Sequence, residues 1–566
     1  MTTMDKPGTD HIDAASVAYD DVDAAKAANI LSPHDMGDVV LVSDDNEVRR
    51  IPIPTDDPND PLNFPKWRKM GIVISCCWFS VFSLLCISGI GTFMNTLYGM
   101  YMPAHTAEEV TSLSTYPSMV MAFGSLGLLP LAFVVGRRPI FLGAVTVCLI
   151  TAITAGASSG FEGHFISRIF MGLATGVTES LLPLIISDAT YLSERSFYFG
   201  LYWSVQNGVN AALLVSLSYL TANLGWRWYY WLFAITLGAS LLSAVFFLPE
   251  TRFQRPAASL NGQIVYTDEF GATHILSDAD ARERFGGDIT MHVDLPASGD
   301  RKRTFVQEVK PWSPVANNGW KIWTGAYIKI LSSLSSPGVW FAMLAGSISL
   351  GIAIAITLIY SGLLEDNYGW SPASVGLFNI GTVPGSFLAM IHSGWFAGKV
   401  NVWLARRNGG VHKPEHHLIH LIIPYVTGGI AIIVFAVCTN SPEKYSAWAL
   451  VIAWAIYEFS FTCIIITVTT FAAEVFPDNP GAAMVPVIGG KNIISFGASY
   501  GLIPMLAKYS YLKSFMILFG IFTGIFALGI PVYFLDSKVR ALSSANFRPF
   551  TEADTEQWKR ANTRKA

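Results

Sequence analysis

The sequence predicts an all-α polytopic membrane protein in which twelve transmembrane helices form two six-helix bundles. Hydrophobic residues make up 52% of the 566 positions and charged residues only 14%, whereas a typical soluble domain has about 25% charged residues. Twelve apolar stretches are each long enough to cross about 30 Å of hydrocarbon. They occur as six, a long polar interval and six more, so the chain should fold as two bundles.

The expected spans follow one another closely within each half. In the first half they lie near residues 70–94, 113–133, 140–158, 163–187, 198–222 and 229–248. In the second half they lie near residues 339–362, 374–396, 418–438, 446–471, 483–507 and 514–535. The chain therefore divides into an acidic N-terminal tail (1–65), a first bundle (66–251), a central segment (252–336), a second bundle (337–538) and a C-terminal tail (539–566).

The distribution of Lys and Arg sets the expected orientation. Loops on the side of the N-terminus hold most of the Lys and Arg residues, and cytosolic loops of membrane proteins carry this excess. We therefore expect both termini and the central segment to be cytosolic, in a multi-pass protein of the plasma membrane. Near the end of the central segment, Trp320, Trp323, Tyr327 and Leu331 recur at helical spacing, which predicts a short helix on the inner membrane surface.

Composition and motifs exclude several function classes. The net charge of −4 gives no basic balance for nucleic acid, and the six cysteines have no metal-ligand spacing. The acidic N-terminus is no cleavable signal peptide. The sequence around GGK at 489–491 lacks the first glycine of a phosphate loop, so the chain is not itself an ATP-driven pump.

Two glutamates, Glu179 and Glu458, lie inside predicted spans four and ten. A charge at such depth costs at least ~2.5 kcal/mol, so intramembrane carboxylates tend to face a cavity and to bind protons, ions or substrate. Arg168 lies eleven residues before Glu179 on the same helical stripe, and we expect it to bias the protonation of a nearby carboxylate. Structural ion pairs are the alternative for all three residues, with Lys491 in span eleven as a possible partner of Glu458.

Other polar residues inside the spans are candidates for substrate contact. Gln206 and Asn210 are one helical turn apart in span five, where amides can orient a substrate or join helices. Tyr457 and Asn492 are weaker candidates of the same kind. In the segment HKPEHHLIH, His416 and His420 could share a zinc ion with Glu415. We expect a cytosolic loop there instead, and no metal or cofactor.

Seven motifs occur in one order along residues 57–540. They are DPNDPLNFPKWRK before span one, PLAFVVGRRPIF between spans two and three, RIFMGLATGV in span four, GWRWYYWLF and LPETRF around span six, WLARRNGGVHKPEHHL between spans eight and nine, and AEVFPDNPGAAM with GGKNIISFG around span eleven. Together they resemble the major facilitator superfamily, and within it the fungal twelve-span drug:proton antiporters. The resemblance implies the major facilitator fold and a monomer in the lipid bilayer.

The resemblance also implies a gate on the cytosolic side. Gly136, Arg137 and Arg138 match the loop between spans two and three, and Asp188 and Arg195 match the network that ends span four. The family's acidic residue and the following arginine of this loop are replaced by Phe133 and Val134, so other contacts should contribute to gating here. The Gly-Pro pair of the antiporter motif in span five is also missing.

These features together predict a proton-coupled secondary transporter of a small organic molecule, not an enzyme, that works by alternating access. Efflux of a xenobiotic or secondary metabolite is the expected direction. Proton-coupled uptake of an organic cation such as a polyamine is the first alternative. A nutrient sensor that keeps the fold without net flux, and a membrane enzyme that uses the histidine cluster, belong to other classes.

Overall fold

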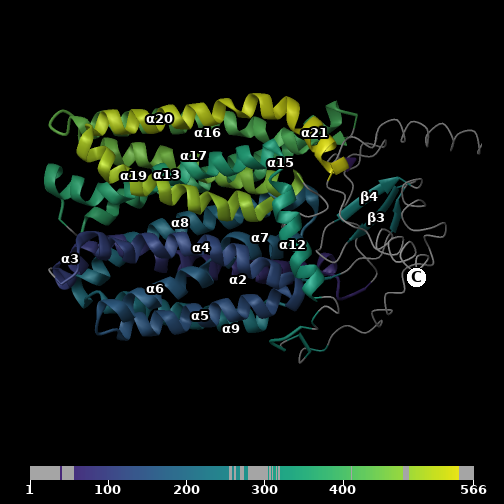
Figure 1. Cartoon of the computed structure of the whole chain (residues 1–566), viewed down its shortest axis with the longest axis horizontal. Helices are drawn as coiled ribbons and strands as arrows, with labels where there is room; N and C mark the ends of the chain where they lie inside the picture. The colour runs from purple at the N-terminus through teal and green to yellow at the C-terminus, as the bar shows by residue number, and fades with distance from the viewer. Residues whose placement is uncertain are drawn as a thin grey trace, which may run out of the picture.

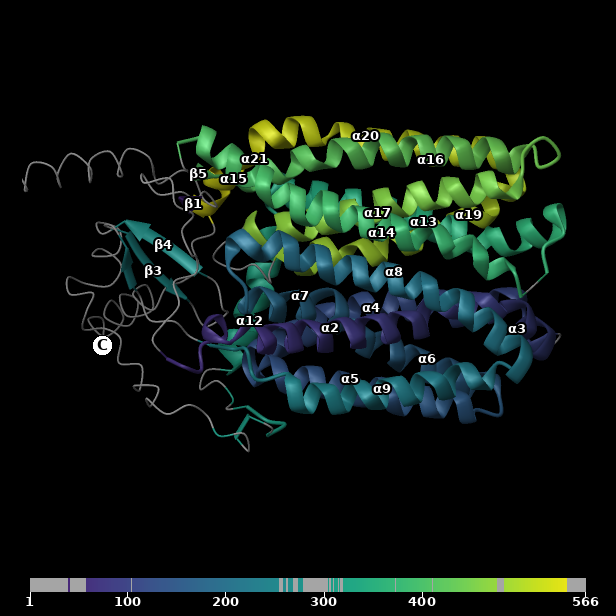
Figure 2. The same ribbon diagram turned by 180° about the vertical axis from the view of Figure 1, so that it is seen from behind.

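The chain folds into two helical bundles that lie side by side along parallel axes (Figure 1). The computed structural model describes the strand Val39–Val40 and residues 57–546, apart from gaps at 103, 254–257, 261–262, 268–272, 278–303, 305–306, 309, 314, 316–318, 372, 410 and 476–482. Most of both predicted tails and the RKR run at 301–303 lie outside these residues. Helices α2 to α9 form one bundle and α13 to α21 the other in both views (Figures 1 and 2).

The first bundle contains six helical rods, several of which are built from consecutive helices. They are α2 (Lys66–Ser88) continued by η2 (Gly89–Phe93), α4 (Ala107–Val135), α5 (Arg137–Ala157), α6 (Phe161–Thr175) continued by α7 (Val177–Asp188), α8 (Leu192–Leu224) and α9 (Arg227–Phe247). Two short helices, η1 (Pro61–Asn63) and α3 (Met94–Tyr101), lie before α2 and after η2.

The second bundle repeats this plan. Its rods are α13 (Pro337–Tyr368), the series η3 (Val375–Gly381), α14 (Thr382–Ala389), η4 (Met390–Phe396) and α15 (Ala397–Arg407), then η5 (Pro414–Leu421) with α16 (Ile422–Asn440), α17 (Ala447–Val475), η6 (Val485–Gly489) with α19 (Gly490–Lys508), and α20 (Tyr511–Ala527) with α21 (Gly529–Asn546).

Among the described residues, ten of the twelve rods are long and apolar enough to cross a membrane. The other two, α8 and η6 with α19, carry the amides and the lysine that the sequence marks inside spans five and eleven. The predicted all-α polytopic fold class is therefore confirmed. Several rods extend past their predicted bounds, and α4 begins earlier than predicted because a capping box precedes its apolar stretch. At the start of α4, Thr106 Oγ1 accepts from the N–H of Glu109, and Glu109 Oε2 accepts from the N–H of Thr106 at 3.1 Å.

The described parts of the central segment lie at one end of both bundles, called the inner end below (Figure 1). It contains an antiparallel sheet of β2 (Ala258–Leu260), β3 (Gln263–Thr267) and β4 (Thr273–Ser277), which periodicity alone did not predict. The predicted short helix is present as α12 (Gly319–Ser333), and the Tyr327 hydroxyl donates to the carbonyl of Leu126 on α4 at 3.2 Å. A second sheet pairs β1 (Val39–Val40) with β5 (Val411–His412), again at the inner end (Figure 2).

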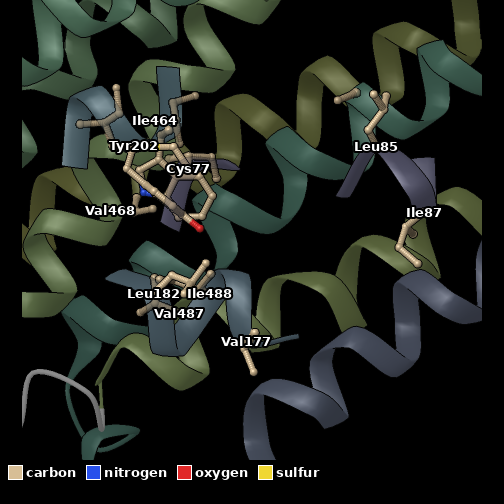
Figure 3. Packing of buried hydrophobic residues seen from close by; sticks show 14 of the residues in the cluster. Cys77, Leu85, Ile87, Val177, Leu182, Tyr202, Ile464, Val468, Val487 and Ile488 are labelled. Atoms are coloured by element: carbon tan, nitrogen blue, oxygen red, sulfur yellow. The ribbon is translucent and has the colours of Figure 1, made fainter. Parts of the chain in front are cut away.

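The buried apolar core is continuous from one bundle to the other. Figure 3 shows Leu182 of α7 close to Val487 and Ile488 of η6, and these two elements contact each other. Large apolar side chains such as Ile235, Leu242 and Ile530 are instead exposed on the outside of the rods. This exposure suits a lipid solvent, which is as apolar as the side chains themselves.

Glycines allow the two bundles to approach closely. A Cβ atom added at Gly200 of α8 would lie only 2.7 Å from the Cα of Gly394 in η4. Any larger side chain at either position would have to push the two bundles apart. The seam between α8 and the rod of η3, α14 and η4 therefore closes tightly toward the inner end.

Candidate functional site

The two bundles are joined by a buried ion pair at Glu179. The Nζ of Lys491, near the start of α19, lies 3.0 Å from Glu179 Oε1, and the Asn492 amide donates to Glu179 Oε2. The three residues are between 3% and 6% exposed. The ammonium of Lys491 also lies 5.2 Å from the ring centre of Trp203 on α8, within the range of a cation–π contact. A carboxylate of the first bundle is thus neutralised by the second.

The position of this pair follows from the helix register. Glu179 lies nine residues before Asp188, which ends α7, so it is about 14 Å from the inner end at 1.5 Å per residue. That depth is near the middle of about 30 Å of hydrocarbon. The sequence left Lys491 as a possible partner of Glu458, and the structure places it against Glu179 instead.

Gln206, predicted to contact substrate, is engaged inside the first bundle. Its amide donates to Ser80 Oγ on α2. The Tyr202 hydroxyl, one turn earlier on α8, lies 2.9 Å from the same Ser80 Oγ and donates to the carbonyl of Thr178 at 2.6 Å. These bonds connect α8, α2 and α7 directly beside Glu179, and they give Gln206 a structural partner.

A second contact between the bundles lies between α8 and α17, where the Asn207 amide donates to Thr462 Oγ1 at 3.1 Å. Asn210 follows Asn207 by three residues and Glu458 precedes Thr462 by four, so each lies on the same helical face as its neighbour. The two helices run in opposite directions, so Asn210 and Glu458 both lie about one turn toward the outer end. The predicted candidates Asn210 and Glu458 are therefore brought together at the bundle interface.

Neither of these two side chains is satisfied by the part of the chain that the structure describes. Asn210 Oδ1 is buried without a hydrogen-bond partner there. Glu458 is 7% exposed and forms no hydrogen bond or ion pair with the described residues. Buried polar groups in proteins are normally paired with protein, water or ligand, so this pair points to something that binds between the bundles.

Three more polar atoms without hydrogen-bond partners among the described residues lie on one stripe of the rod opposite α8. They are Asn379 Nδ2, Thr382 Oγ1 and Ser386 Oγ. Ser386 faces α8 directly, because a Cβ atom at Gly208 would lie 3.4 Å from its Cβ. We call Asn210, Glu458, Asn379, Thr382 and Ser386 the central polar site. Its last three members were not predicted from sequence, although their spacing of three and four residues in an apolar run is a visible signal.

The other two predicted substrate contacts are already bonded. The Tyr457 hydroxyl donates to the carbonyl of Ser349 at 2.7 Å, and its ring stacks on Trp454, with ring centres 6.1 Å apart. Trp454 in turn donates through Nε1 to Asn379 Oδ1 at 3.2 Å, which links this aromatic pair to the central polar site. Asn492 is the amide that holds Glu179.

Arg168 binds main-chain oxygens. Its guanidinium donates to the carbonyls of Leu113, Cys86 and Ile87, each at 2.7 Å. These bonds tie α6 to α4 and to the outer end of α2. The expectation that Arg168 biases a nearby carboxylate has no support in this geometry, since its hydrogen bonds go to backbone and to the Tyr230 hydroxyl.

The predicted gate residues form a connected network at the inner end of the first bundle. Arg137 Nε donates to Asp188 Oδ2 at 3.3 Å, and Thr251 Oγ1 donates to the same oxygen at 3.2 Å. Glu250 accepts from the backbone N–H groups of Arg137 and Arg138 at 3.0 and 3.3 Å. A carboxylate in this place stabilises the N-terminus of α5 through the helix dipole. Glu250 was not predicted as a site residue from sequence.

Gly136 makes this arrangement possible. Its φ of 114° lies in a region that favours glycine, and a side chain there would collide with Glu250. The replaced positions Phe133 and Val134 are held by their carbonyl oxygens, which accept from Arg252 Nη1 at 3.0 and 2.9 Å. Arg252 thus adds a contact at the replaced positions, and its contribution to gating stays a prediction. Arg195 is buried near the start of α8 at the same end.

The second bundle has histidines at the corresponding place. His412 Nε2 and His417 Nε2 each lie 2.8 Å from Glu474 Oε2, near the end of α17. The pair considered from sequence does not form: His420 Nε2 donates to Asn401 Oδ1 at 3.1 Å, and His416 Nδ1 accepts from the backbone of Lys413. The histidine spacing alone could not show this, because Glu474 is distant in the chain.

Comparisons with known proteins agree with this architecture. A family model described as the Major Facilitator Superfamily matches residues 80–485. Protein HOL1 of Saccharomyces cerevisiae is 22% identical over 549 residues, which cover 88% of this chain and 92% of the relative. An uncharacterized MFS-type transporter of Schizosaccharomyces pombe, C1271.10c, is 22% identical over 70% of this chain and 72% of its own length.

The solved structure of the proton:xylose symporter XylE covers 85% of this chain and all of its own, with a TM-score of 0.54 and 13% identity. At this identity the likeness shows the fold alone.

Proposed function

We propose, because the chain belongs to the major facilitator superfamily, that it is a proton-coupled secondary transporter which moves a small organic molecule by rocking its two bundles. The observation that carries this proposal is the ion pair of Glu179 with Lys491, which joins the bundles near the middle of the membrane. The two bundles cannot separate at this depth without breaking the pair. Breaking a buried pair costs about 3–5 kcal/mol, since it leaves an uncompensated charge.

A proton on Glu179 changes that cost. The neutral acid no longer attracts the ammonium of Lys491, which then keeps its contact with the ring of Trp203. Proton binding at Glu179 thereby lowers the barrier to opening, and this is the coupling step of the proposed cycle.

The central polar site supplies the substrate-binding step. Glu458 and Asn210 each lie one turn beyond the Asn207–Thr462 contact, on α17 and α8. Asn379, Thr382 and Ser386 lie on the rod that packs against α8, and a bound molecule would satisfy the polar groups of this site. The stacked rings of Trp454 and Tyr457 border the same region and offer apolar surface.

Efflux of a xenobiotic or secondary metabolite is the direction that we propose. The resemblance of the seven motifs to drug:proton antiporters supports this direction, and the proposal takes the inner end as cytosolic and the protein as one of the plasma membrane. The contacts of Arg137, Asp188 and Glu250 would close the inner end of the first bundle during the outward-facing part of the cycle.

Uptake of an organic cation, such as a polyamine, is the second candidate. Glu458 favours it, because a buried carboxylate without an ion pair among the described residues is well suited to bind an ammonium group.

Flux measurements in cells that lack their own pumps test both candidates. With labelled substrates, loss of label that a protonophore abolishes supports efflux, and protonophore-sensitive gain supports uptake. Glu179→Gln should remove the pH dependence of flux while the protein stays in the membrane, and Glu162→Gln, which is exposed on α6, is the matched control. If Glu179→Gln keeps normal pH-dependent flux, the coupling role of Glu179 is wrong. If no candidate moves in either direction, the sensor hypothesis is favoured over transport.

A further inference from the structure

Three side chains converge at the inner end of the second bundle, outside the proposed transport path. His412 is in β5 and His417 in η5, both in the connection from α15 to α16, and Glu474 is the second-last residue of α17. The chain must close a loop of some sixty residues to bring them together. All three are buried.

Their geometry is that of a small chelate. Two imidazole nitrogens, His412 Nε2 and His417 Nε2, each lie 2.8 Å from one carboxylate oxygen, Glu474 Oε2. The three donor atoms lie within 4.8 Å of one another. The imidazole planes are inclined at 82° to each other. Two histidines and one glutamate are a known ligand set for Zn²⁺, with water in the fourth position.

The surroundings can support metal binding. His417 Nδ1 lies 3.0 Å from the side-chain amide of Asn401. The oxygen and nitrogen of such an amide exchange places when the side chain rotates by half a turn. In the rotated form Asn401 Oδ1 accepts a hydrogen bond from the Nδ1–H of His417, which leaves the lone pair of His417 Nε2 for a metal. Metal-bound histidines regularly donate their second N–H in this way. His420 Nε2 then accepts from the Asn401 amide nitrogen.

The carboxylates at the inner ends of α7 and α17 differ in the charge of their partners. At the end of α7, Asp188 meets the permanent positive charge of Arg137 at 3.3 Å. At the end of α17, Glu474 meets two imidazoles, which carry no charge in their neutral form. A divalent cation between them would supply the charge that arginine supplies in the first bundle. His412 Nδ1 is buried and has no hydrogen-bond partner among the described residues, so the tautomer of this imidazole is not fixed by a bond at Nδ1.

We propose that His412, His417 and Glu474 form a Zn²⁺ site that fixes the connection between α15 and α16 to the inner end of α17. The strand β5, which contains His412, is paired with the N-terminal strand β1, with Val39 opposite His412. The metal therefore also determines where this N-terminal strand is held. This inference does not depend on the proposed transport function.

Zinc titration of the whole protein in lipid nanodiscs, after removal of metal by a chelator, tests the site. We expect one tight Zn²⁺ per chain, measured by competition with a fluorescent zinc indicator. His412→Ala, His417→Ala and Glu474→Gln should each weaken binding by about 100-fold or more, and Asn401→Ala by about 10-fold, as for groups that orient a ligand. His416→Ala and the distant His105→Ala should bind as the wild type does.

Co²⁺ gives an independent measurement on the unaltered protein. A tetrahedral site with nitrogen ligands gives intense visible absorption bands, which added Zn²⁺ should abolish. The wild-type spectrum decides the question even if a variant fails to fold. Absence of stoichiometric Zn²⁺ binding in the wild type would overturn the proposal, and so would folded variants of the three ligands that retain wild-type affinity.

Discussion

The two bundles each bury one glutamate on corresponding rods, and each surrounds it differently. Glu179, on the fourth rod, forms an ion pair with Lys491 and accepts a hydrogen bond from Asn492, both from the other bundle. Glu458, on the tenth rod, forms no hydrogen bond or ion pair within the described part of the chain. Their depths also differ, because Glu179 lies nine residues before Asp188 and Glu458 sixteen before Glu474. The two halves therefore place corresponding helices alike, while the glutamates on these helices have different surroundings.

The same contrast holds at the inner ends of these rods. Asp188 is bonded to an arginine, which stays charged at every accessible pH, whereas Glu474 is bonded to two histidines. The first bundle thus has a fixed contact at this place. The second has a contact that depends on what the histidines bind.

Lys491→Met should have the largest effect, because it leaves Glu179 buried without its counter-charge. We expect a loss of about 3–5 kcal/mol in stability, measured as a lower unfolding temperature in detergent, together with loss of transport. Glu179→Gln combined with Lys491→Met should regain most of the stability, since both charges are then gone.

Lys508→Met is the control, because Lys508 is exposed at the other end of the same helix. If Lys491→Met is as stable as this variant, the ion pair does not hold the bundles together, and the two glutamates are more alike than the structure indicates.

Glu458→Gln should change substrate binding and leave stability nearly unchanged, in contrast to Lys491→Met. It removes no ion pair, so its stability should stay near that of the wild type. If the substrate is a cation, loss of a charge-assisted hydrogen bond of about 1.5–3 kcal/mol should weaken its binding by roughly 10- to 150-fold. A scintillation-proximity binding assay on purified protein measures this. A large loss of stability with unchanged affinity would assign Glu458 a structural role instead.

The fold was predictable from sequence, because an apolar stretch of twenty residues has few alternatives in lipid. The buried glutamates were also predictable, because an ionisable residue inside such an apolar stretch is conspicuous. Their partners were not, because which face of α19 meets α7 depends on how two bundles pack. That packing rests on close approaches such as Gly200 against Gly394, which a local pattern does not contain. Arg252 and Glu250 were not predicted for the same reason, since they reach the predicted gate residues from beyond span six.

Gly200→Ala tests whether the close approach of Gly200 and Gly394 keeps the seam between the two bundles closed. The added methyl would lie 2.7 Å from the Cα of Gly394, so the seam must open. Overpacking of this kind costs about 1–3 kcal/mol. We expect faster maleimide labelling of a cysteine introduced at Ser393, which is buried beside the seam. Gly398→Ala, whose added methyl has open space, should leave the labelling rate unchanged. Equal rates in the two variants would show that the seam is already open.

The smallest effects are expected from a matched pair of tyrosines, one in each bundle. The Tyr202 hydroxyl donates to the carbonyl of Thr178, and the Tyr457 hydroxyl donates to the carbonyl of Ser349. Replacement of either by Phe removes one hydrogen bond, which costs about 0.5–1.5 kcal/mol of stability. Because both hydroxyls are satisfied inside their own bundle, substrate affinity should change little in both variants. If Tyr457→Phe alone weakens substrate binding by about tenfold or more, its hydroxyl exchanges Ser349 for substrate during transport. Tyr457 would then act as the sequence first suggested, and the second bundle would carry the binding site to a greater degree than the first.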